Sequence, residues 1–112
     1  MNRGDIYFVR LDPTVGNEIN KCRPVVIVSN DATNLVSPLL TIVPLTSNTK
    51  QVFSFEVLLE TNETGLLKKS KAQCHQIRTI SKSRISGKLA GKVDDEKITR
   101  LNYAIRVHLA LL

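Results

Sequence analysis

The stretch that decides the fold is Arg23-Pro24-Val25-Val26-Ile27-Val28-Ser29-Asn30. Its four consecutive β-branched residues predict a strand that is buried on both faces, because neither face of the pleat then carries a polar side chain. Pro24 suits the first position of such a strand, where no ladder hydrogen bond is lost. Arg23 therefore stands where a polar loop enters the core, held by a rigid strand and with its guanidinium free to face solvent.

Short apolar runs on either side of this stretch predict further strands. From residue 53 to residue 60 apolar and polar residues alternate, which is typical of a half-exposed strand. Asn62 to Gly65 is expected to form a turn, and Asn34 to Pro38 an irregular link. The predicted strands cover residues 6–9, 25–28, 39–43, 53–59, 71–77 and 88–92.

The C-terminal residues predict the one helix of the chain. Asp94 is a suitable N-cap, and Val93 with Ile98 fits a hydrophobic staple. Several short strands, no βαβ alternation and one closing helix predict a mainly β fold with minor α content. We expect a small, strongly curved sheet or partly open barrel with a helix packed on it, and a single domain over residues 1–112. The apolar stripe of the helix consists of Ile98, Leu101, Ile105, Leu109 and Leu112.

The charge of the chain favours a polyanionic partner, since the net charge is +6 and the pI is near 9.6. Between Gly65 and Val93 there is no Asp or Glu at all. This segment is either a solvated basic face or a surface that follows phosphates, and the exclusion of acids favours the second interpretation. Aromatic residues make up 4% of the chain and Trp is absent, which argues against large aromatic stacking platforms. The basic residues of the segment are Lys68, Lys69, Lys71, Arg78, Lys82, Arg84, Lys88 and Lys92.

Two cysteines, Cys22 and Cys74, cannot make a disulfide-rich scaffold. With His75 and His108 they offer four potential zinc ligands, but no Cys-x-x-Cys or His-x-x-x-His spacing is present, so we expect no metal and no other cofactor. No apolar signal region follows Met1, and no apolar run approaches the ~20 residues of a membrane helix. We therefore expect a cytoplasmic protein with reduced thiols and no membrane segment.

The chain also carries five short motifs in a fixed order: Arg3-Gly4-Asp5-Ile6-Tyr7, Gly16-x-Glu18, Arg23-Pro24-Val25-Val26-Ile27, Pro44-Leu45-Thr46-Ser47 and Gln76-Ile77-Arg78-Thr79-Ile80. Each motif alone is weak, but together their order and spacing resemble the MazF/PemK toxins, the ribonucleases of bacterial toxin–antitoxin pairs. The resemblance covers almost the whole chain. It implies a small SH3-like open barrel, as in CcdB, Kid and MazF, a homodimer, and cleavage of single-stranded RNA. It also implies a cognate antitoxin whose acidic segment covers the active groove.

The resemblance further implies roles for individual residues. Arg23 and Thr46 match the catalytic arginine and its hydroxyl partner, and Glu18 matches the carboxylate of a loop. Gln76 and Arg78 match residues that line the RNA groove. Where the PemK branch has an acidic catalytic residue, this chain has His75. Further RNA contacts are expected from Asn17, Lys21, Ser47, Lys68, Lys69, Lys71 and Lys82.

These residues suffice for RNA cleavage, because RNA carries its own nucleophile in the 2′-hydroxyl. Arg23 supplies bidentate, charge-assisted donors to phosphate oxygens. Thr46 adds a neutral hydroxyl donor, a preorganised contact worth about 3–4 kcal/mol. An arginine is a poor proton acceptor because its pKa exceeds ~12, although the family view gives the arginine a share of the acid–base work. Glu18 and His75 are physically easier bases, and the choice among the three stays open.

The leading hypothesis is a growth-inhibiting mRNA interferase. It would be a metal-independent, sequence-selective endoribonuclease that leaves a 2′,3′-cyclic phosphate or 3′-phosphate and a 5′-hydroxyl. One alternative is a gyrase poison similar to CcdB, but that family depends on a tryptophan near the C-terminus, whereas this chain ends Leu109-Ala110-Leu111-Leu112. The other is an RNA-binding barrel without catalysis, in which Arg23→Ala would weaken binding and there would be no cleavage to lose.

Overall fold

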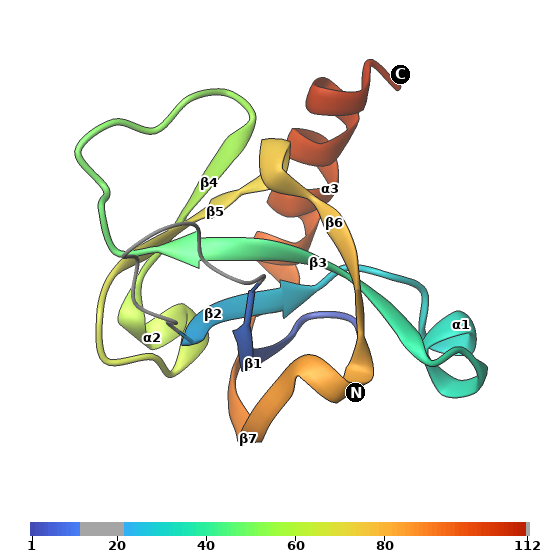
Figure 1. Ribbon diagram of the computed structural model, residues 1–112. Coiled ribbons are helices and arrows are strands. Elements are labelled where there is room, and N and C mark those ends of the chain that lie inside the picture. Colours follow the sequence, from blue (N-terminus) through green and yellow to red (C-terminus); the bar gives the residue numbers. More distant parts are fainter. Residues whose placement is uncertain (12–21, 112) are drawn as a thin grey trace, which may run out of the picture.

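The computed structural model describes residues 1–11 and 22–111 (Figure 1). In these residues a mostly antiparallel β-structure carries one long helix and two short ones. The strands are β1 (Asp5–Arg10), β2 (Cys22–Ile27), β3 (Leu39–Thr46), β4 (Glu56–Leu59), β5 (Ser70–Gln73), β6 (Arg78–Ser81) and β7 (Ile85–Lys92). The helices are α1 (Asp31–Val36), α2 (Thr61–Thr64) and α3 (Asp95–Leu109), with two 3₁₀ turns, η1 (Cys74–Gln76) and η2 (Lys82–Arg84).

The strands form one open sheet in the order β4-β5-β3-β2-β1-β7, with β6 paired to β3 as well. Along one edge, β3 changes its partner: Leu39 to Ile42 pair with β6, and Leu45 and Thr46 pair with β5. Pro44 stands at this change, where a residue without a backbone N–H costs no bond on that edge. The strand predicted to end at Val43 therefore continues through Pro44 to Thr46.

The core confirms the prediction for β2. Val25, Val26 and Ile27 are fully buried and alternate between two apolar clusters. Val26 belongs to the larger cluster, which includes Leu101 and Ala104 of α3, while Val25 and Ile27 belong to the smaller cluster on the other face. Because both faces of this strand are covered, its position and the direction of its side chains are fixed by packing.

Helix α3 confirms the predicted C-terminal helix. Its N-cap is Asp94, whose carboxylate accepts the backbone N–H of Lys97 at 2.9 Å. Leu101 and Ala104 are buried and Ile98 and Ile105 pack against the same cluster, so this part of the apolar stripe faces the sheet. Of the other predicted stripe residues, Leu109 is 46% exposed and Leu112 lies outside the described residues. Among the described residues, no helix is long and apolar enough to cross a membrane.

Two predicted loops are instead short helices. The link at residues 34–38 was wrong in part, because α1 begins after Asn30, which caps it by accepting the N–H of Ala32 at 2.7 Å. Inside α1, the buried side chain of Asn34 donates to the carbonyl of Ser29 at 2.9 Å. The turn at residues 62–65 includes α2, which is closed by Gly65 in the left-handed conformation (φ 82°). Both helices owe their stability to polar caps, which apolar periodicity does not reveal.

Three more predicted strands have other bounds. The strand expected over 71–77 ends at Gln73. This strand, β5, pairs with the end of β3, whereas β6 pairs with the beginning of β3. The chain has to cross from one to the other, and η1 makes that crossing. The half-exposed strand over 53–59 begins only at Glu56, and that carboxylate is buried instead of exposed. The strand expected over 88–92 begins at Ile85.

Candidate active site

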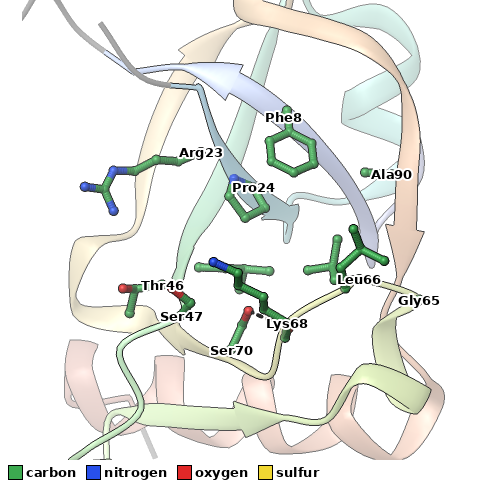
Figure 2. A pocket seen from close by; sticks show the side chains of 12 residues that line it. Phe8, Arg23, Pro24, Thr46, Ser47, Gly65, Leu66, Lys68, Ser70 and Ala90 are labelled. Carbon is green, nitrogen blue, oxygen red and sulfur yellow. Dashed lines mark hydrogen bonds between the residues drawn. The ribbon is translucent and has the colours of Figure 1, made fainter. Parts of the chain in front are cut away.

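Arg23 and Thr46 come together because β2 and β3 are antiparallel neighbours. Their ladder ends at the pair Val25–Pro44, and the same register carried two residues further sets Arg23 opposite Thr46. Directly opposed residues of an antiparallel pair share one face of the sheet. Both residues line the same pocket at these strand ends (Figure 2). The structure therefore brings together the two residues that the sequence placed in separate motifs.

The two side chains are available to a ligand. Arg23 is exposed, and within the described part of the chain its guanidinium has no hydrogen-bond or ion-pair partner. The Oγ1 atom of Thr46 accepts the backbone N–H of Asn48 at 3.3 Å, so its hydroxyl hydrogen is free to be donated. In Figure 2 the guanidinium extends outward from the rim on the side where Thr46 lies. A charged and a neutral donor thus line the same pocket at the ends of two neighbouring strands, an arrangement suited to a phosphate group.

Behind this rim lies a pocket of about 460 Å³. Arg23, Thr46, Ser47 and Lys68 form its polar side, and in Figure 2 the Lys68 side chain reaches across the pocket toward the rim. The rest of the wall is largely apolar and comes from β1, β2, β3, β5, β7 and the segment after α2. The remaining lining residues are Phe8, Pro24, Leu45, Gly65, Leu66, Leu67, Ser70 and Ala90.

A buried ion pair supports the strand end that carries Thr46. Lys71 is the ladder partner of Thr46, and its Nζ lies 3.1 Å from Oε1 of Glu56, with side-chain exposures of 11% and 2%. The same ammonium donates to the carbonyl of Gln51 at 2.6 Å, and Glu56 accepts the backbone N–H of Phe53 at 3.1 Å. These contacts fix the segment that follows the site. Lys71 is therefore enclosed in the scaffold, with two of its three ammonium donors bound to Glu56 and Gln51.

The other predicted lysines occupy different surroundings. Lys68 lines the pocket, whereas Lys69 lies at 3.6 Å from Glu60 in an exposed ion pair. Lys82 in η2 donates to the carbonyl of Asn34 and so lies beside α1, away from the rim. Of these lysines, only Lys68 lines the pocket together with Arg23 and Thr46.

His75, Gln76 and Arg78 do not line this pocket. His75 is exposed in η1, where its ring packs edge-on against Phe55 at 4.7 Å and faces His108 at 6.4 Å between centroids. Gln76 is exposed at the end of the same turn. Arg78 is the ladder partner of Ile42, so it lies on the face of Thr46 but four residues along β3, about 13 Å away.

Three predicted residues, Asn17, Glu18 and Lys21, lie outside the described residues. Of the two cysteines, Cys22 is exposed and Cys74 is buried. Burial, with a smaller contribution from the charge of Glu56, raises the pKa of Cys74 to about 12, so its thiol stays protonated at neutral pH and is not a nucleophile. In residues 1–11 and 22–111 no three His, Cys, Asp or Glu side chains gather into a metal-binding group.

Residues 2–109 match the family of PemK-like, MazF-like toxins of type II toxin–antitoxin systems, and the chain belongs to this family. It is 43% identical to the endoribonuclease MazF9 of Mycobacterium tuberculosis over 116 residues, which cover 99% of this chain and 98% of that protein. It is 33% identical to the endoribonuclease EndoA of Bacillus subtilis over 113 residues, which cover 100% and 97%. A solved MazE–MazF structure from Deinococcus radiodurans shares the fold, with a TM-score of 0.82 at 21% identity and coverage of 100% and 97%.

Proposed function

We propose that the chain is a metal-independent, sequence-selective endoribonuclease that cuts single-stranded mRNA as the toxin of a toxin–antitoxin pair. The observation that supports this function best is the convergence of Arg23 and Thr46 on one exposed rim. The two relatives that cover nearly the full chain are named endoribonucleases, which supports the same activity here. Residues 1–112 act as one catalytic domain.

In the proposed reaction the 2′-oxygen of a ribose attacks the adjacent phosphorus while the bond to the 5′-oxygen breaks. Arg23 binds the non-bridging oxygens and neutralises the charge that grows on them, and Thr46 donates to the same group. Glu18 or His75 takes the proton from the 2′-hydroxyl, and a protonated group, either Arg23 or the acid form of that base, returns one to the 5′-oxygen. The products are a 2′,3′-cyclic phosphate, or the 3′-phosphate after hydrolysis, and a 5′-hydroxyl.

The wider RNA path follows from the placement of the remaining polar residues. Lys68 and Ser47 hold RNA at the pocket, and Arg78 and Gln76 contact it further along the same face. Lys69 attracts phosphate at longer range, and Asn17 and Lys21 add loop contacts. We leave out Lys71 and Lys82, whose ammonium groups the fold already uses.

The proposed partners are a cognate antitoxin and a second copy of the chain, in the cytoplasm. A related toxin from Deinococcus radiodurans was solved together with MazE, which supports the antitoxin for this chain. Arg23 and Lys68 give an acidic antitoxin segment two cations at the same rim that binds RNA. An antitoxin seated there would exclude the substrate.

The function is tested with purified protein and a single-stranded RNA in EDTA. We expect cleavage at full rate without metal, with a cyclic phosphate at the new end. One substrate carries a 2′-deoxy nucleotide at the cut site, and it should stay intact because the nucleophile is missing. Loss of cleavage in EDTA, or cleavage of the deoxy substrate, would contradict the mechanism.

The role of Lys68 predicts a change in salt dependence. Replacing Lys68 by alanine removes one phosphate contact, so the slope of log affinity against log salt should fall by roughly 0.7 for single-stranded RNA. The measurement is the binding of a 2′-deoxy oligonucleotide at several salt concentrations. Arg100→Ala removes an equal charge from the exposed surface of α3 and should leave the slope unchanged. Equal slopes for Lys68→Ala and the parent protein would place Lys68 off the RNA path.

A further inference from the structure

The pocket behind Arg23 and Thr46 has two chemically different ends. At the rim stand the cations of Arg23 and Lys68 and the hydroxyl of Thr46, which suit an anionic group. Deeper in, Figure 2 shows the ring of Phe8 on one side and the side chain of Leu66 near the opposite wall. A ligand that fits both ends must join a negative charge to a flat or apolar body.

The deep end is a built cavity, because glycine geometry holds its walls together. The segment after α2, which supplies Leu66, lies against β7, which supplies Ala90. This contact requires Gly91, since a Cβ at that position would stand 2.1 Å from the carbonyl oxygen of Thr64. The volume of about 460 Å³ falls in the range of pockets that hold small organic groups.

Because side chains alternate along a strand, the polar rim and the apolar cavity lie on opposite faces of β2 and β3, at the point where these strands end. Pro24 follows Arg23 in β2, and Leu45 precedes Thr46 in β3. The side chains of Pro24 and Leu45 therefore point to the other face, toward the cavity. Because Arg23 and Thr46 also line the pocket, a phosphate held at the rim lies at the cavity mouth. If the proposed function is correct, a nucleotide that flanks the scissile phosphate has to lie beside this opening.

We propose that the cavity is a nucleobase pocket, and that it receives one of the two bases flanking the phosphate that is cut. This inference rests on the proposed function and names the part of the RNA that the chain reads beside the cut. Single-stranded RNA is recognised by bases that are splayed out and stacked on aromatic rings. Phe8, 39% exposed in spite of its place in β1, offers such a ring, and Ser47 offers a hydroxyl group for the base edge. The hydroxyl of Ser70 donates to the carbonyl of Lys68 and can act toward a base only as an acceptor.

The test fills the cavity with a larger side chain and measures whether cleavage still depends on the base beside the cut. The main variant is Ala90→Phe, and Phe8→Ala removes the ring from the opposite side. Leu89→Phe is the matched control, because the neighbouring position on β7 is 51% exposed and does not line the pocket. The substrates are one oligonucleotide with normal bases, one abasic on the 5′ side of the cut, and one abasic on the 3′ side.

In the parent protein, removal of one of the two flanking bases should lower kcat/KM by roughly tenfold or more, the size of a lost base–aromatic contact. In Ala90→Phe and Phe8→Ala that difference should disappear, and the base preference at that side, read by sequencing the cut ends, should flatten. Leu89→Phe should behave as the parent. Unchanged sensitivity in both pocket variants, with melting curves that show a folded protein, would overturn the proposal.

The proposal for the pocket can be tested independently of the proposed function. If the parent does not cut RNA at all, binding of an uncleavable 2′-deoxy oligonucleotide with 2-aminopurine beside the central phosphate still reports on the pocket. A fluorescence change that Ala90→Phe abolishes would support the pocket, and no change in the parent would refute it. If Ala90→Phe loses only the binding of an acidic antitoxin peptide and keeps its base preference, the occupant is a peptide and the proposal is wrong.

Discussion

Replacing Arg23 by alanine should lower the rate of RNA cleavage by roughly 10³-fold while the protein stays folded. A single preorganised donor to a developing oxyanion contributes about 10²–10³ in kcat, and Arg23 adds a full charge to that contact. Because its side chain is exposed and has no partner among the described residues, the fold does not depend on it. Rates are measured in single turnover with excess enzyme, and the fold is followed by circular dichroism and the melting temperature.

Two further variants identify what Arg23 supplies. Arg23→Lys keeps the charge but replaces the planar fork by a point charge, so it should recover only part of the rate. Thr46→Ala should reduce the rate by roughly 10²-fold, since the lost donor is neutral. Arg100→Ala on α3 serves as the control for loss of an exposed arginine. Cleavage by Arg23→Ala at a rate near that of the parent would remove the basis of the catalytic assignment.

The second large effect concerns stability, and it arises at the Lys71–Glu56 ion pair. Lys71→Met alone should lower the free energy of unfolding by about 3–5 kcal/mol, because it leaves the Glu56 carboxylate, 2% exposed, without its counter-ion. Gln51 loses the donor to its carbonyl in the same change. Glu56→Leu alone should cost a similar amount, since it leaves a buried ammonium.

The double variant Lys71→Met with Glu56→Leu should regain most of that loss, as buried ion pairs and apolar pairs of similar volume are often equally stable. The comparison pair is Lys69–Glu60, whose side chains are about half exposed, so Lys69→Met should cost less than about 1 kcal/mol. Free energies of unfolding are measured from urea unfolding curves, and the variants are compared where the dependence of the free energy on urea concentration is the same. Equal small effects at both pairs would show that the buried pair contributes no more than a surface contact.

The sequence predicted those elements whose signal is local. The run of β-branched residues at 25–28 and the apolar stripe of 98–109 each indicate one structure without knowledge of the rest of the chain, and both were confirmed. The helix α1 was missed because its stability comes from the Asn30 cap and the Asn34 side chain.

Long-range pairing explains the other differences. Nothing near Gln73 indicates that β5 must end there, because the reason is the exchange of partners along β3. The site shows the same division. The motifs placed Arg23 and Thr46 in one site, whereas the enclosure of Lys71 and the cavity behind Phe8 depend on segments that meet only in the folded chain.

The exchange of partners along β3 has a consequence for the two proposed catalytic groups. Arg23 lies on β2, which pairs with β1 as well as with β3. Thr46 belongs to the short stretch of β3 that is hydrogen-bonded to β5. The guanidinium and the alcohol are thus anchored in two hydrogen-bonded ladders that meet along β3, and the larger apolar cluster contains residues from both ladders. The distance between the two donors is therefore set by the stretch of β3 at Pro44, whose ladder partner Val25 lies two residues from Arg23 and which itself lies two residues from Thr46.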